Sequence, residues 1–198
     1  TVSKKSVVYV VDSMPETMDN LALKKPASAS SQAAPAEGPE KAVDGLITGS
    51  KWCAVGSGGQ WLTIDLQDTY TLSSFRIHHA EAGGEGASAN TYSYTISVSP
   101  DGSAFTPVVD VTDNTQGVTE HAITPTAARY VRLNIRQAVS PGTQWPAARI
   151  FELEAYGITG DVSQLPEYVA PNTADLEALL EEVSGLAEAD HTVTTWGK

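Results

Sequence analysis

Acidic side chains are the residues of this sequence whose types and spacing could first suggest catalysis. The close pairs among them are Glu152/Glu154, Glu181/Glu182 and Glu81/Glu85. General acid–base catalysis requires two carboxyls on opposite sides of one bond, one of them with a raised pKa. Sequence spacing does not provide that placement, and exposure to solvent explains most acidic pairs. We therefore interpret these residues as surface groups and predict that the chain is not an enzyme.

Nucleophilic and zinc-dependent catalysis have no recognisable motif either. No serine lies in a G-x-S-x-G elbow, and the four histidines show no H-E-x-x-H spacing. Cys53 is the single cysteine, so it can form no intramolecular disulfide and no paired-cysteine zinc site. We interpret Cys53 as a small side chain packed beside Trp52.

The loop at residues 41–52, with the sequence KAVDGLITGSKW, carries oxygen groups that suit a hard cation. Asp44 and Gly45 begin a tight turn, and Thr48 and Ser50 supply hydroxyls nearby. Calcium binds carboxylate, hydroxyl and backbone carbonyl oxygens together. The loop alone has too little negative charge, so a second carboxylate must come from elsewhere in the sequence. An ordinary Asp-Gly turn is the alternative interpretation.

The elements that must position these residues are short strands. The clearest β-like runs are residues 61–66, 72–78, 92–99, 106–111, 129–136 and 149–156. Several alternate: Tyr94, Ile96 and Val98 face one way while the residues between them face the other. Turn signals such as Pro100-Asp101-Gly102 separate the runs. This pattern predicts an all-β fold, an antiparallel β-sandwich or jelly roll.

Four segments follow from the changes in composition. Residues 1–19 contain one apolar run at 7–11 and a polar connector, and residues 20–157 form the strand-rich domain. Residues 158–171 have the composition of a linker. Residues 172–198 predict a C-terminal amphipathic helix, because Leu176, Leu179, Leu180, Val183 and Leu186 recur at helical spacing. This helix either packs on the sandwich or begins a truncated module, and we favour truncation, since the segment resembles small helical repeats of Gram-positive surface enzymes.

Six blocks of sequence resemble a known fold. They are Asn20-Leu21-Ala22, residues 41–45 through Trp52, residues 61–66, residues 99–102 followed by Phe105, residues 128–133 and residues 152–157. In this order they resemble the coagulation-factor C-type, or discoidin, domain, and most of all the family 32 carbohydrate-binding modules of bacterial glycosidases. The resemblance covers residues 20–157 and implies a galactose-binding-domain-like jelly roll.

The resemblance also implies a structural calcium ion. The family's ligands match the side chains of Asp44, Ser50 and Glu152, and the backbone oxygens of Lys41, Leu46 and Phe151. Glu152, on the last strand, would supply the missing second carboxylate. The loop is one residue longer than is usual in the family, so either Thr48 or Ser50 could provide the hydroxyl.

The sugar site expected from the resemblance lies on the loops 51–60, 78–90 and 138–146. Cys53 stands where many galactose-binding relatives carry a histidine, and the second loop has no arginine. That loop instead resembles a subgroup that accompanies enzymes acting on N-acetylhexosamine-containing host glycans. We predict a sugar site whose residues are His79, Glu81, Glu85 and Asn90 for hydrogen bonds and Trp145 as aromatic platform. Alternatively, Asn90 caps a turn, Glu81 is solvated and Trp145 packs against Ile150.

The net charge of the chain excludes some classes of binding partner. The formal net charge of −12 argues against nucleic acid and anionic membranes, which both require a basic surface. We expect a monomeric module, secreted or on the surface of a bacterium, with a catalytic glycosidase domain in the same polypeptide. Residues 1–25 contain no recognisable signal peptide, so an exported protein would need a targeting segment upstream. The expected ligand is terminal galactose or N-acetylhexosamine; an adhesion module and a structural spacer are the alternatives.

Overall fold

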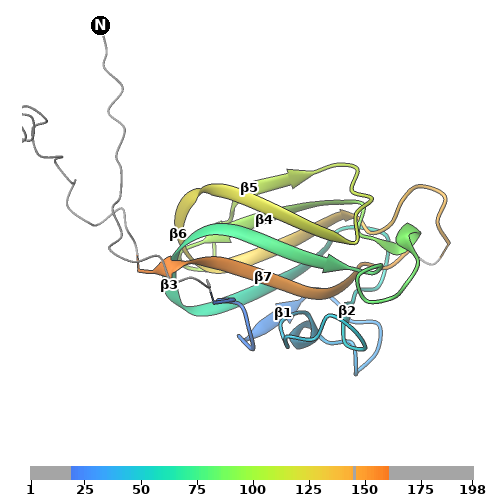
Figure 1. The fold of residues 1–198 in the computed structure, drawn as a ribbon, viewed down its shortest axis with the longest axis horizontal. Coiled ribbons are helices and arrows are strands. Elements are labelled where there is room, and N and C mark those ends of the chain that lie inside the picture. Colours follow the sequence, from blue (N-terminus) through green and yellow to red (C-terminus); the bar gives the residue numbers. More distant parts are fainter. Residues whose placement is uncertain (1–18, 145, 161–198) are drawn as a thin grey trace, which may run out of the picture. The chain divides into compact units, whose positions relative to one another are not determined.

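A computed structural model describes residues 19–144 and 146–160 (Figure 1). The elements are β1 (Ala27–Ala29), η1 (Pro39–Ala42), β2 (Trp52–Cys53), β3 (Gln60–His79), η2 (Ala87–Ala89), β4 (Ser93–Ser99), β5 (Thr106–Val111), β6 (Val118–Gln137) and β7 (Arg149–Thr159). The all-β prediction is confirmed, since the only helical elements in the described part of the chain are two short 3-10 turns. None of the described helices is long and apolar enough to span a membrane. The predicted strand at 7–11 and helix at 172–198 lie outside the described residues.

Two long strands give the domain its two layers. The first half of β3 pairs with β1 and with the second half of β6, which also pairs with β4. The second half of β3 pairs with β7 and with the first half of β6. All pairings are antiparallel, in the order β2-β7-β3-β6-β4-β5. Because β3 and β6 contribute to both layers, as Figure 1 shows, the chain forms the jelly roll expected from its sequence.

The middle of β3 bends where the strand passes from one layer to the other. Gln67 there has a φ of 69°, which is costly for a residue other than glycine. Its backbone N–H donates a hydrogen bond to Asp65 Oδ1 at 2.8 Å. Arg129 on β6 donates to both oxygens of the same carboxylate, at 2.7 and 2.8 Å. These bonds lower the pKa of Asp65 and fix both the bend and the pairing of β3 with β6.

The apolar core lies between the two layers. Inward-facing residues of β3 and β6, such as Leu62, Ile64 and Leu133, are fully buried. Trp52 is also fully buried, and its Nε1 donates to the Ser31 carbonyl at 2.9 Å. Cys53 next to it is a buried free thiol, as the sequence predicted. Trp52 is therefore a core residue and is not available to a ligand.

A polar pair closes the core near the end of β3. His79 is fully buried, and its Nε2 lies 3.1 Å from Thr119 Oγ1. The Tyr94 hydroxyl donates to the same Thr119 oxygen at 3.0 Å. Burial, helped by the nearby charges of His121 and His78 when protonated, lowers the pKa of His79 to about 3. His79 is consequently neutral in the folded domain at neutral pH.

We predict an acid-dependent loss of stability that His79 causes. Its folded pKa lies below the unfolded value of about 6.5, so its contribution is complete above pH 6.5 and declines as pH falls toward 3. The expected slope is up to about 1.4 kcal/mol per pH unit. Urea unfolding should show that the wild type loses stability relative to His79→Gln, which cannot titrate, as pH falls from 6.5 to 4.5, so that any stability advantage of the wild type shrinks. A difference that is constant over this range would contradict the buried neutral histidine.

Candidate functional site

The first candidate centre joins the 41–52 loop to the last strand. Ser50 Oγ donates a hydrogen bond to Asp44 Oδ2 at 2.6 Å. The backbone N–H of Gly45 donates to both carboxylate oxygens of Glu152, at 3.2 Å each. The Asn20 amide also approaches Glu152 Oε1, at 3.5 Å. Three predicted side-chain ligands therefore gather at one place, and the hydroxyl next to Asp44 is that of Ser50.

The electrostatics of this centre suit a divalent cation. Glu152 is only 1% exposed, and burial, together with the charges of Asp44 and Glu154, raises its pKa to about 7. In the described residues no group of three or more His, Cys, Asp or Glu side chains is placed to hold a metal. The available donors are instead two carboxylates, a hydroxyl and backbone carbonyls, which is the oxygen-only set that calcium prefers. The expected carbonyl donors Lys41, Leu46 and Phe151 belong to η1, the turn after Gly45 and β7.

Two residues predicted to bind sugar, His79 and Asn90, are buried and have almost no surface that a ligand could contact. His79 points into the core because it continues the inward-facing series of Phe75 and Ile77 on β3. Asn90 is 1% exposed, and its amide is fully engaged. Its Oδ1 accepts from the Glu81 backbone N–H at 2.8 Å, and its Nδ2 donates to Glu81 Oε2 at 3.0 Å and to the Thr115 carbonyl at 3.2 Å. Asn90 thus closes the 81–90 loop, which was the alternative interpretation.

Glu85 is the predicted sugar residue that lies in a polar, partly exposed cluster. Its carboxylate contacts Lys51 Nζ at 2.8 Å and Arg149 Nε at 3.0 Å. Lys51 also contacts Glu37 at 3.4 Å. Burial alone would lower the pKa of Lys51. The hydrogen bonds and negative charges of Glu85 and Glu37 have a larger combined effect, so the pKa of Lys51 is raised. We call Glu37, Lys51, Glu85 and Arg149 the loop-end cluster.

Three members of the loop-end cluster, Glu37, Lys51 and Arg149, were not predicted from the sequence. One signal was available: Arg149 begins the last strand and pairs in register with Cys53, next to the 51–60 loop. The contacts themselves join distant parts of the chain, so sequence spacing could not reveal them. The cluster side chains are 18–29% exposed, so they are accessible and still partly desolvated.

The backbone shape of the 81–90 loop supports this cluster. Lys51 Nζ lies 5.6 Å from the centroid of the Phe151 ring, below the loop. A side chain at Gly83 would overlap that same ring, so only glycine lets the loop approach β7 this closely. Glu81, in contrast, is exposed and contacts Asn90 rather than the loop-end cluster.

Residues 138–144 lie at the same end of the sandwich, on the right of Figure 1. Thr143 Oγ1 donates to the Ser88 carbonyl at 3.3 Å, which joins this loop to the 81–90 loop. A hollow of about 450 Å³ separates Ser57 from residues 139–143. The predicted platform, Trp145, lies outside the described residues.

Comparisons with known proteins agree with this geometry. A jelly roll with polar loops collected at one end is the architecture of β-sandwich ligand-binding domains. Residues 26–153 match the model of the F5/8 type C domain, and the chain belongs to that family. No curated protein sequence matched the chain.

Solved structures place the domain among carbohydrate-binding folds. A chitosan-binding module from a Paenibacillus sp. IK-5 chitosanase/glucanase, solved with chitotriose, is 27% identical with a TM-score of 0.55, covering 70% of this chain and 100% of that one. The family 32 carbohydrate-binding module of Streptococcus pneumoniae EndoD is 24% identical, with a TM-score of 0.63 and coverage of 70% and 99%. A Clostridium perfringens module in complex with GalNAc-β-1,3-galactose is 21% identical, with a TM-score of 0.59 and coverage of 71% and 100%. The predicted resemblance to family 32 modules is confirmed.

The hydrogen bonds of Asn90 lead to a stability prediction. Asn90→Ala should lower the unfolding free energy by about 2 kcal/mol, because it removes a buried amide that makes three hydrogen bonds and leaves the Glu81 N–H and the Thr115 carbonyl without this partner. Urea unfolding measures the change, and Asn134→Ala, which removes only hydroxyl contacts on the sheet face, is the comparison. Wild-type stability of Asn90→Ala would show that the amide does not hold the loop.

Proposed function

We propose that this domain is a non-catalytic carbohydrate-binding module that holds a terminal galactose or hexosamine-type sugar at its loop end. The observation that carries the proposal is the Glu85 carboxylate shared by Lys51 and Arg149, at 2.8 and 3.0 Å, in a partly exposed position among three loops. Sugars are recognised by planar polar groups of this kind, fixed in place by their own contacts.

The chemistry of the loop-end cluster favours a sugar that carries nitrogen at C2. The carboxylates of Glu37 and Glu85 can accept hydrogen bonds from hydroxyl and N–H groups. Lys51 and Arg149 can donate to hydroxyl oxygens and to an acetamido carbonyl. The Paenibacillus module with chitotriose, an oligomer of an amino sugar, supports this choice, being 27% identical to the chain. Galactose-type sugars without nitrogen would use only part of the cluster.

We also propose that the module is exported and belongs to a bacterial glycoside hydrolase whose catalytic domain is part of the same polypeptide. The Paenibacillus neighbour, which derives from a chitosanase/glucanase, supports this assignment. The acidic surface expected from the net charge of −12 is compatible with an exported module.

A calcium ion completes the proposal. Asp44, Ser50 and Glu152 would bind it through their side chains, with the backbone oxygens of Lys41, Leu46 and Phe151. The ion would neutralise the Asp44 and Glu152 carboxylates, the second of which has a pKa raised by burial and by the charge of Asp44, and it would tie the 41–52 loop to β7. The ion would have a structural role. By binding Ser50 it would fix the backbone position of the next residue, Lys51, which belongs to the loop-end cluster.

We predict that sugar binding depends on Glu85. Isothermal titration with chitotriose, N-acetylglucosamine, N-acetyllactosamine and galactose should give dissociation constants in roughly the micromolar to millimolar range. Glu85→Gln should weaken binding of the best ligand at least about tenfold, or about 1.4 kcal/mol. Glu81→Gln, on the same loop but outside the cluster, should bind as wild type does.

Two results would contradict sugar binding at the loop-end cluster. If Glu85→Gln and wild type bind equally, the ligand binds elsewhere on the domain. If the wild type binds none of the sugars on a broad glycan array, the domain is an adhesion module or a spacer.

We predict that calcium stabilises the folded domain. Adding calcium to EDTA-treated protein should raise the Tm by about 5 °C or more, since a ligand bound only by the native state adds stability. Asp44→Asn should abolish the rise, and the exposed control Asp113→Asn should keep it. A wild-type Tm that calcium and EDTA leave unchanged rules the ion out.

A further inference from the structure

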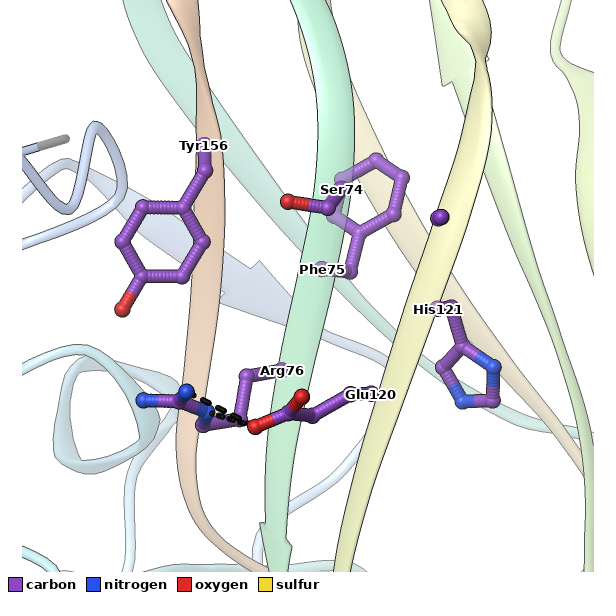
Figure 2. Close-up of a pocket in the computed structure, with 7 residues that line it drawn as sticks. Ser74, Phe75, Arg76, Glu120, His121 and Tyr156 are labelled. Carbon is purple, nitrogen blue, oxygen red and sulfur yellow. Dashed lines mark hydrogen bonds and ion pairs between the residues drawn. The ribbon is translucent and has the colours of Figure 1, made fainter.

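A hollow of about 750 Å³ lies on the outer face of the layer formed by β7, β3 and β6 (Figure 2). Its lining includes Tyr156 on β7, Ser74 and Arg76 on β3, and Glu120 and Ala122 on β6. Figure 2 shows the Tyr156 ring on one side, Ser74 beside it, and the Arg76–Glu120 pair crossing from β3 to β6. This hollow contains no member of the loop-end cluster.

An irregular pairing of the strands produces the hollow. Between Leu72 and Ser74, β3 advances by two residues while its partners on β6 change from Thr126 to Ala122, an advance of four. Such bulges bend a strand and redirect its side chains. Ser74 and Ala122 pair directly beyond the bulge, and these two small residues make the floor.

Tyr156 is held in a fixed orientation as one wall. Its hydroxyl donates a hydrogen bond to Glu154, and the same carboxylate lies 3.0 Å from His78 Nε2 and 3.5 Å from Arg76 Nη1. A phenol ring fixed through its hydroxyl keeps its apolar surface available, and such a surface packs against the C–H face of a sugar ring. The orientation is therefore set before any ligand arrives, which reduces the entropic cost of binding.

The Arg76–Glu120 pair determines the charge of a suitable ligand. Arg76 contacts Glu120 at 2.7 Å and also Glu154, so the hollow offers no cation that lacks a carboxylate partner. An anionic ligand would meet two carboxylates and is disfavoured. Among residues 19–144 and 146–160 the Ser74 hydroxyl makes no hydrogen bond, so it can donate to and accept from a ligand hydroxyl. The chemistry fits a neutral polyhydroxylated ring.

We propose that this hollow is a second sugar-binding site, which takes one neutral hexose unit of an oligosaccharide. Ser74 lies five residues before His79 on β3, which corresponds to about 17 Å of strand, so the site is separate from the loop end. Two sites on one domain would bind a longer glycan, or two neighbouring chains, with higher avidity. Sugar binding in this hollow does not depend on sugar binding at the loop end.

The test is an NMR titration of the full chain with cellohexaose, N-acetylchitohexaose and, as the anionic comparison, hexagalacturonate. At least one neutral probe should shift the amide resonances of Ser74, Ala122 and Tyr156 in a saturable manner, and hexagalacturonate should shift them less. Shifts confined to the loop-end amides would overturn the second site and leave the proposed function intact. Stronger shifts with hexagalacturonate would overturn the neutral ligand.

Variants separate the hollow from general effects on folding. Tyr156→Ala removes a wall, and Ala122→Arg fills the floor at an exposed position without removing any wall. Both should weaken binding at the hollow about tenfold or more and leave binding at the loop end unchanged. Thr124→Arg, an exposed residue of β6 outside the hollow with the same charge change, should bind as wild type does. Equal behaviour of Ala122→Arg and Thr124→Arg would contradict the proposal.

Discussion

The bend of β3 is the constraint on which the rest of this domain depends. β3 can belong to both layers only because Gln67 accepts a positive φ, and Asp65 stabilises that conformation through Gln67 and Arg129. Beyond the bend, β3 pairs with β7, and this pairing carries Glu152 and Arg149 to the end where the loops meet. A side chain on the last strand thereby reaches groups that lie a hundred residues earlier in the sequence.

Charged side chains are partly or fully buried at two places near the loop end, and the two places differ in whether the carboxylates have basic partners. At Glu152 two carboxylates come together with no basic side chain of the described residues in contact, so backbone N–H groups offset part of the charge and protonation or a cation would balance the rest. In the loop-end cluster each carboxylate has a basic partner, and the side chains are partly exposed. The first arrangement suits a structural ion, and the second suits reversible binding of a polar, uncharged or weakly charged molecule.

The strands were predictable from the sequence because period-two alternation and turn residues are local signals, and β5 was predicted with its observed bounds. The burial of His79 could also have been predicted from the sequence. Phe75 and Ile77 face inward, and extending the predicted strand by one residue places His79 on the same side. The turn-closing role of Asn90 was an open alternative from the sequence, since its partner Glu81 is on the same loop, but its bond to Thr115 joins a distant segment and could not be predicted. The loop-end cluster was hidden for the same reason, since Lys51, Glu85 and Arg149 meet only when the loops and β7 are folded together.

A crystal structure of the protein soaked with chitotriose would show whether the loop-end cluster binds sugar. We expect density for a terminal sugar whose polar atoms lie within hydrogen-bond distance of Glu85 and of Lys51 or Arg149. A sugar bound only at another surface, or a loop end left without ligand at saturating chitotriose while a different glycan binds elsewhere, would contradict it.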